Sequence, residues 1–180
     1  MDDDYSSVHV DSERILLTIP TQRLECCHAA GSLEFGPDQM LYIAVGDNTN
    51  PFESGGYAPI DDRRGRSPWD ARKSSANTDD LRGKILRIKV ENEGYSIPEG
   101  NLFQEDGSEG RPEIYVMGCR NPYRLAFDNH RGYLYWGDVG PDANESDDNR
   151  GPRGYDEINQ ARTAGNFGWP LFIGNNLPYN

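Results

Sequence analysis

The stretch that decides the fold is RPEIYVMGCRNPYRLAFDNHRGYLYWGDVGPD, residues 111–142. Its apolar, aromatic-rich segments at 113–117 and 133–136 are typical of short β-strands. Between them lie the polar tripeptide Arg120-Asn121-Pro122 and a predicted turn at 128–132. The stretch ends in a loop with glycine and proline, which predicts a sharp turn that exposes backbone carbonyls. A charged tripeptide between strands is not needed by a fold, so we consider it a candidate site.

The whole chain, 1–180, is predicted to be a single domain of short strands and polar loops. Further strands are expected at 14–20, 32–35, 40–45, 81–90, 95–98 and 155–161, with turns at 36–39 and 165–170. Residues 1–13 are polar and predicted to be disordered. Residues 48–80 have no helical or strand periodicity, so we expect a long surface loop.

Two parts of the chain share a pattern. In 33–47 and in 125–138, a Leu-x-Phe strand is followed by a Leu-Tyr strand and then by Gly-Asp. Repeated antiparallel hairpins separated by polar loops indicate an all-β fold of the β-propeller type. Two copies and a preceding strand make two to three blades, fewer than the four that usually close a ring. We therefore expect the chain to be an arc of a larger propeller.

Composition excludes several classes of function. The chain has 180 residues, of which 20 are Gly and 12 are Pro, and its net charge of −12 disfavours nucleic acid or an anionic membrane as a partner. No apolar run is long enough to span a membrane. Residues 1–14 are acidic and lack an apolar core, so they do not form a signal peptide.

Three cysteines do not make a disulfide framework, and their spacing does not indicate a zinc site. Cys26 and Cys27 are adjacent and either form a vicinal disulfide or remain as small buried thiols, the interpretation that we favour. Cys119 is also expected to be a buried thiol.

Five motifs occur in the order of one known family. They are CHAAGSLEFGPDQMLYIAVGD (27–47), DLRGKILRI (80–88), RPEIYVMGCRNPYRLAFD (111–128), LYWGDVGPD (134–142) and YDEINQARTAGNFGWP (155–170). With them the chain resembles the soluble, pyrroloquinoline quinone (PQQ)-dependent glucose/sorbosone dehydrogenases, also called aldose sugar dehydrogenases. The resemblance implies a six-bladed β-propeller, of which this chain covers the middle part.

The resemblance also implies a site. His28 matches the general base, which takes the hydroxyl proton of the sugar as hydride leaves. Arg120 and Asn121 match the residues that contact the quinone, and Arg120 would also stabilise charge during hydride transfer. Gly140 and Pro141 match the residues whose carbonyls bind Ca2+. The simpler interpretations are an ordinary hydrogen-bonded histidine, an arginine paired with a carboxylate, and a plain turn.

Other polar residues fit structural roles better. The acidic loop after Pro141 fails the EF-hand pattern at its sixth and twelfth positions and is expected to be solvated. Asp47, Asp138, Asp156 and Glu157 are expected to accept hydrogen bonds from turn backbone rather than to form a glycosidase pair. Trp169 and the other large aromatics are expected to fill the core between blades.

By this resemblance the full-length parent oxidises an aldose, passes electrons to an acceptor such as cytochrome c, and is periplasmic or secreted. The alternative is a non-catalytic propeller that binds carbohydrate or protein and has lost the cofactor. Cys27 and Ala29 favour the alternative, because the family's best-known members have aspartate and glutamine there. The presence of His28, Arg120-Asn121 and Gly140-Pro141 together favours the enzyme.

Overall fold

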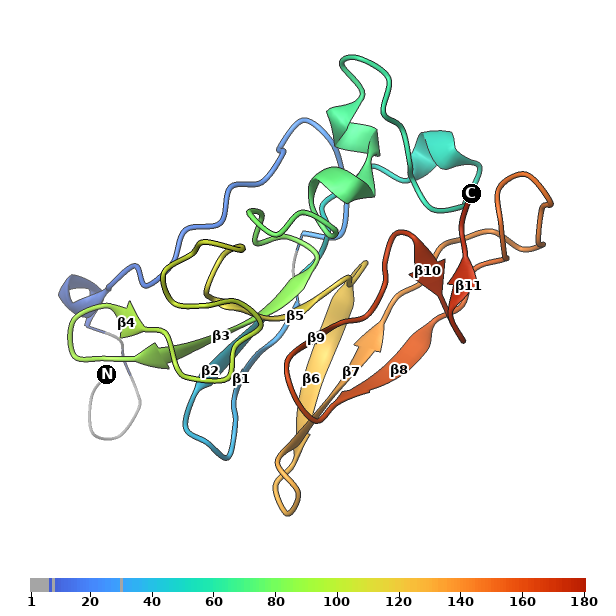
Figure 1. Cartoon of the computed structure of the whole chain (residues 1–180). Helices are drawn as coiled ribbons and strands as arrows, with labels where there is room; N and C mark the ends of the chain where they lie inside the picture. The colour runs from blue at the N-terminus through green and yellow to red at the C-terminus, as the bar shows by residue number, and fades with distance from the viewer. Residues whose placement is uncertain (1–6, 8, 30) are drawn as a thin grey trace.

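Two β-sheets lie side by side in the computed structural model, which describes residues 7, 9–29 and 31–180 (Figure 1). The described residues form strands and short 3-10 helices but no α-helix. The all-β class predicted from the sequence is therefore confirmed, while the described residues do not close a ring. None of their helices is long and apolar enough to cross a membrane.

The larger sheet has the order β1-β2-β3-β5-β9, and β4 pairs with β3. Its strands are β1 (Leu33–Phe35), β2 (Leu41–Val45), β3 (Lys84–Val90), β4 (Tyr95–Ser96), β5 (Ile114–Met117) and β9 (Gly165–Asn166). The pairs are antiparallel except for β5 with β9, which are parallel. The predicted aromatic turn at 165–170 thus begins as a short strand.

The smaller sheet has the order β6-β7-β8. Its strands are β6 (Pro122–Asp128), β7 (Tyr133–Asp138) and β8 (Glu157–Ala161). The predicted turn between β6 and β7 forms because the Asp128 carboxylate accepts the backbone N–H groups of His130 and Arg131. A separate hairpin near the C-terminus pairs β10 (Phe172–Ile173) with β11 (Leu177–Pro178).

The predicted repeat is confirmed in the pairing of the strands. Phe35 of β1 lies opposite Leu41 of β2, and Phe127 of β6 lies opposite Leu134 of β7. Both hairpins therefore have the same register, and each ends in the Gly-Asp pair.

The main core lies between the two sheets. Its buried residues are Tyr42, Ala44, Ile85, Val116, Cys119, Leu125, Leu134, Trp136 and Ala161. Tyr42 and Phe127 meet edge to face at 4.8 Å, so aromatic rings from both sheets interlock. Removing this apolar surface from water stabilises the packing of the sheets by roughly 25 cal/mol per Å2.

The strand predicted at 14–20 is wrong. These residues have no strand partner among the described residues, and Leu17 and Ile19 pack against a second buried cluster that includes Leu86 and Met117. Their apolar side chains cover a face of the larger sheet instead of extending its edge. The disorder predicted for 1–13 falls mostly outside the described residues; within them, η1 (Val10–Ser12) is an exposed 3-10 turn.

The 48–80 segment contains three 3-10 turns and no strand: η2 (Phe52–Ser54), η3 (Ser67–Trp69) and η4 (Ala71–Lys73). Several of its residues are buried, so the segment predicted as a surface loop also packs into the interior. Lys84 of β3 anchors it, because the ammonium group donates to the carbonyls of Ser74, Ser75 and Arg82. Burial lowers the pKa of Lys84 to about 8.

Candidate functional site

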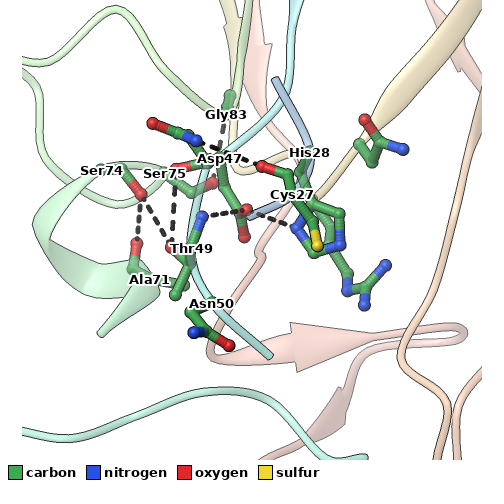
Figure 2. A network of polar contacts seen from close by, with 12 residues as sticks. Cys27, His28, Asp47, Thr49, Asn50, Ala71, Ser74, Ser75 and Gly83 are labelled. Atoms are coloured by element: carbon green, nitrogen blue, oxygen red, sulfur yellow. Dashed lines mark hydrogen bonds and ion pairs between the residues drawn. The ribbon is translucent and has the colours of Figure 1, made fainter. Parts of the chain in front are cut away.

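His28 is paired with a buried aspartate. Its Nδ1 lies 2.8 Å from Oδ1 of Asp47, with 9% of the His28 side chain and none of the Asp47 side chain exposed (Figure 2). Asp47 lies two residues after the end of β2, so that strand fixes the position of the carboxylate. A hydrogen bond at Nδ1 leaves Nε2 as the nitrogen that can exchange a proton.

Asp47 is also bound by three other parts of the chain. Its carboxylate accepts the backbone N–H of Thr49 at 3.0 Å and the indole N–H of Trp169 at 2.8 Å. Its own backbone N–H donates to the carbonyl of Arg120 at 2.8 Å. The prediction that Asp47 only satisfies turn backbone is therefore incomplete, because it also orients a histidine and a tryptophan.

The turn that carries His28 is held by close backbone packing. The side-chain amide of Asn48 donates to the carbonyl of Cys27 at 3.2 Å, and its backbone N–H donates to the carbonyl of His28 at 3.1 Å. Gly46 lies so close that a Cβ there would be 1.9 Å from the His28 carbonyl oxygen. His28 itself has a positive φ of 48°, which is uncommon for residues other than glycine.

Cys26 and Cys27 form a disulfide, so the favoured interpretation as buried thiols is wrong. Cys26 is exposed and Cys27 is half-buried, because the turn before His28 lies outside the apolar clusters. Cys119 is a buried thiol as expected, and burial raises its pKa.

Arg120 lies between β5 and β6 and is buried. Its Nη1 donates to the carbonyl of Val139 at 2.9 Å, and its guanidinium carbon lies 5.8 Å from the centre of the Trp169 ring. Its Nε is buried with no hydrogen-bond partner among the described residues. The same holds for Oδ1 of the neighbouring Asn121.

The alternative of an arginine paired with a blade carboxylate is not observed for Arg120 among the described residues. Asp138 accepts the backbone N–H groups of Arg120 at 3.2 Å and Asn121 at 2.6 Å, and Asp156 accepts that of Gly140 at 2.8 Å. The prediction that these aspartates satisfy backbone donors is confirmed. Burial raises the pKa of Asp138 to about 7, against the lowering effect of the two N–H groups.

Gly140 and Pro141 follow β7 after one exposed residue, Val139, and are buried. Neither carbonyl accepts a hydrogen bond from the described residues. Both residues line a shallow cleft together with Asp142 and Asn144. No cluster of three or more His, Cys, Asp or Glu side chains suited to a metal occurs in the described part of the chain, so carbonyl oxygens would have to supply much of any cation site here.

The structure brings these residues together in two groups. Arg120 and Gly140 line one small cavity, with Tyr155 and Trp169, and Gly140 and Pro141 line the neighbouring cleft. His28 lines neither, and Asp47 and Trp169 connect it to Arg120.

Two residues of this network were not predicted as functional. The Gly-Asp that ends both hairpins was a signal for Asp47, whereas nothing in the sequence distinguished Trp169 from a core aromatic.

Two sheets packed around one core, with polar residues at the strand ends, define a domain of the all-β class. The family model described as "Glucose / Sorbosone dehydrogenase" matches residues 2–179. The chain belongs to the glucose/sorbosone dehydrogenase family.

Known relatives include both named enzymes and proteins without an enzymatic name. The chain is 34% identical to the HIPL1 protein of Arabidopsis thaliana over 83% of its own length and 19% of the relative's. It is 31% identical to an aldose sugar dehydrogenase of Escherichia coli over 80% of the chain and 29% of the relative.

The chain is also similar to a solved structure of an aldose sugar dehydrogenase. The PQQ-bound aldose sugar dehydrogenase of Streptomyces coelicolor is 26% identical with a TM-score of 0.57, over 88% of this chain and 34% of that protein. The chain therefore spans only part of each of these proteins. It covers 34% of the Streptomyces coelicolor enzyme, 29% of the Escherichia coli enzyme and 19% of the HIPL1 protein.

Proposed function

We propose that the full-length protein oxidises an aldose or a related sugar, with His28 as the general base and PQQ as the electron acceptor. The observation that carries this proposal is the buried His28–Asp47 pair, joined through Trp169 to a buried arginine. The similarity to aldose sugar dehydrogenases supports the class of reaction.

His28 would remove the hydroxyl proton from C1 of the sugar. With Nδ1–H donated to Asp47, the lone pair of Nε2 is free to accept that proton. The buried carboxylate then stabilises the imidazolium that forms, because a nearby negative charge favours the protonated ring. The C1 hydrogen leaves as hydride, so the alcohol carbon becomes a carbonyl carbon.

The residues around Arg120 fit a quinone with carboxylate groups. The Nε of Arg120 and the Oδ1 of Asn121, which have no hydrogen-bond partner in the described part of the chain, are a donor and an acceptor for a polar ligand. When bound, PQQ would supply the two-electron acceptor for the hydride. Arg120 would hold it and offset the negative charge that accumulates during transfer.

Gly140 and Pro141 fit a calcium site. Their two carbonyls accept no hydrogen bond from the described residues, and Ca2+ prefers hard oxygen ligands in flexible geometry. We expect Ca2+ bound there to hold the cofactor next to Arg120. The same proposal includes a six-bladed ring, an electron acceptor such as cytochrome c and a periplasmic or secreted location.

A non-catalytic carbohydrate- or protein-binding propeller is the second candidate. Two differences from the best-known enzymes of the family favour it. Position 27, directly before His28, is a cysteine in a disulfide with Cys26 instead of an aspartate, and position 29 is alanine instead of glutamine. The identity shared with the HIPL1 protein is consistent with it.

The test is reconstitution of the full-length protein with PQQ and Ca2+, followed by dye reduction with aldoses. We expect His28→Ala to lower kcat by about 10²-fold to 10⁴-fold with quinone binding retained, because a general base typically contributes that much. The matched control is His130→Ala, which changes an exposed turn histidine. Absence of both turnover and a quinone absorbance shift in the wild type would leave the second candidate.

A further inference from the structure

Trp169 contributes to the candidate site through its indole N–H, which donates to Oδ2 of Asp47 at 2.8 Å. The other oxygen of this carboxylate, Oδ1, lies 2.8 Å from Nδ1 of His28 and accepts the backbone N–H of Thr49 at 3.0 Å. Figure 2 shows His28 and Thr49 on opposite sides of the Asp47 carboxylate. Among the described residues, the indole is therefore the one donor that Oδ2 has.

The indole is held in place by contacts of its own. Trp169 is buried, its backbone N–H donates to the carbonyl of Gly118 at 3.1 Å, and its carbonyl accepts the hydroxyl of Ser75 at 3.2 Å. Its ring packs edge to face against Tyr179, with the ring centres 6.1 Å apart. A donor fixed in this way is in place before a ligand binds, so it needs no reorganisation during a reaction.

The hydrogen bond from Trp169 limits how strongly the Asp47 carboxylate attracts a proton. Asp47 is fully buried, so donors of the protein take the place of water in stabilising its charge. A hydrogen bond to the charged form of a group favours that form. Without the indole N–H, the pair of His28 and Asp47 would bind its proton more tightly, whichever of the two carries it. His28 would then need a higher pH before it could accept a proton from a sugar.

Charged groups from three parts of the fold act near this pair. Lys84 of β3 and Asp138 of β7 interact electrostatically with Asp47. Arg120, between β5 and β6, has its guanidinium carbon 5.8 Å from the centre of the Trp169 ring. A phenyl ring at position 169 would keep the contact with Arg120 and leave Lys84 and Asp138 unchanged. Replacing Trp169 with phenylalanine therefore removes the indole N–H from Asp47 and little else.

We propose that Trp169 is a positioning residue: its indole N–H holds the buried Asp47 carboxylate and thereby extends to lower pH the range in which His28 can act as a base. The inference rests on the proposed function for the role of His28. The coupling of the indole to the pair of His28 and Asp47 depends only on the contacts given above.

The test is Trp169→Phe in the full-length protein reconstituted with PQQ and Ca2+. We expect the acid limb of the kcat pH profile to move up by about one pH unit, because a hydrogen bond to an ionised group is lost. Below that limb kcat should fall about ten-fold, and at high pH it should return to the wild-type value. PQQ binding should not change, because the ring beside Arg120 remains. A merely structural role of Trp169 would instead lower kcat at every pH.

The matched control is Trp136→Phe. Trp136 is also buried, and its indole N–H has no hydrogen-bond partner among the described residues, so the same substitution removes no such bond there. Denaturant unfolding checks that both variants are folded. The proposal is overturned if the two variants have the same pH profile, or if the loss of turnover in Trp169→Phe persists at high pH.

NMR of the cofactor-free, full-length wild type with 15N-labelled Trp and His needs no variant and separates the two proposals. We expect the indole N–H signal of Trp169 to shift with pH at the same midpoint as the ring nitrogens of His28, while the signal of Trp136 does not. That result in a protein that oxidises no aldose would reject the oxidation and retain the coupling of Trp169 to the pair. Turnover with a Trp169 signal that does not follow His28 would reject the role of Trp169 alone.

Discussion

At the scale of single residues, Asp47 connects the parts of the candidate site. It is fully buried and binds His28, Thr49 and Trp169, while its backbone contacts Arg120. A buried carboxylate with all its partners in place restricts the histidine to one tautomer and one orientation.

We predict that Asp47→Asn lowers kcat by about 10²-fold or more while PQQ binding changes little, because the amide cannot stabilise the imidazolium by charge. Steady-state kinetics and quinone absorbance of the full-length protein measure the two effects. Asp79→Asn is the control, since Asp79 is exposed. An equal loss of quinone binding would mean that Asp47 acts on the fold rather than on His28.

At the scale of elements, the two repeated hairpins have the same register but different surroundings. Gly46 after β2 lies against the turn that carries His28, where a Cβ would meet the His28 carbonyl. At its counterpart Gly137 in β7, the same position has no atom within 4 Å from the other described residues, its chain neighbours aside. Glycine is thus required at position 46, because the backbone of His28 approaches it closely, but not at position 137.

This difference predicts that Gly46→Ala destabilises the protein by about 1–3 kcal/mol or more, the usual cost of overpacking, and displaces His28. Gly137→Ala should be close to neutral. Denaturant unfolding of the two variants measures the effect on stability, and turnover reports the position of His28. Similar unfolding free energies for both variants would contradict the close approach.

At the scale of the whole molecule, the two sheets leave strand edges uncovered within the described residues. β1 is an edge strand whose Leu33 and Phe35 are 66% and 62% exposed, and β8 is an edge strand whose Ile158 is 89% exposed. Exposed apolar edge strands pair readily with other chains.

The 180-residue chain by itself is therefore expected to associate with itself as its concentration rises. Sedimentation velocity over a range of concentrations should show this, and replacing both Leu33 and Phe35 with Lys should reduce it. Val10→Lys is the control, because Val10 is 77% exposed but lies in η1 rather than on a sheet edge. A monomeric chain at all concentrations would show that these edges are not adhesive.

The sequence by itself determined the β class, most strands and the repeated hairpins, because alternating apolar residues and turn-forming Gly, Pro and Asp act over a few neighbouring residues. Only the tertiary structure decided how distant residues meet. Asp47 and Trp169 are far apart along the chain, and no local pattern predicts their hydrogen bond. The same reason explains the error at 14–20, whose apolar side chains cover a sheet face. Local signals predict elements, whereas the His28 network depends on which loops the packing of the two sheets brings together.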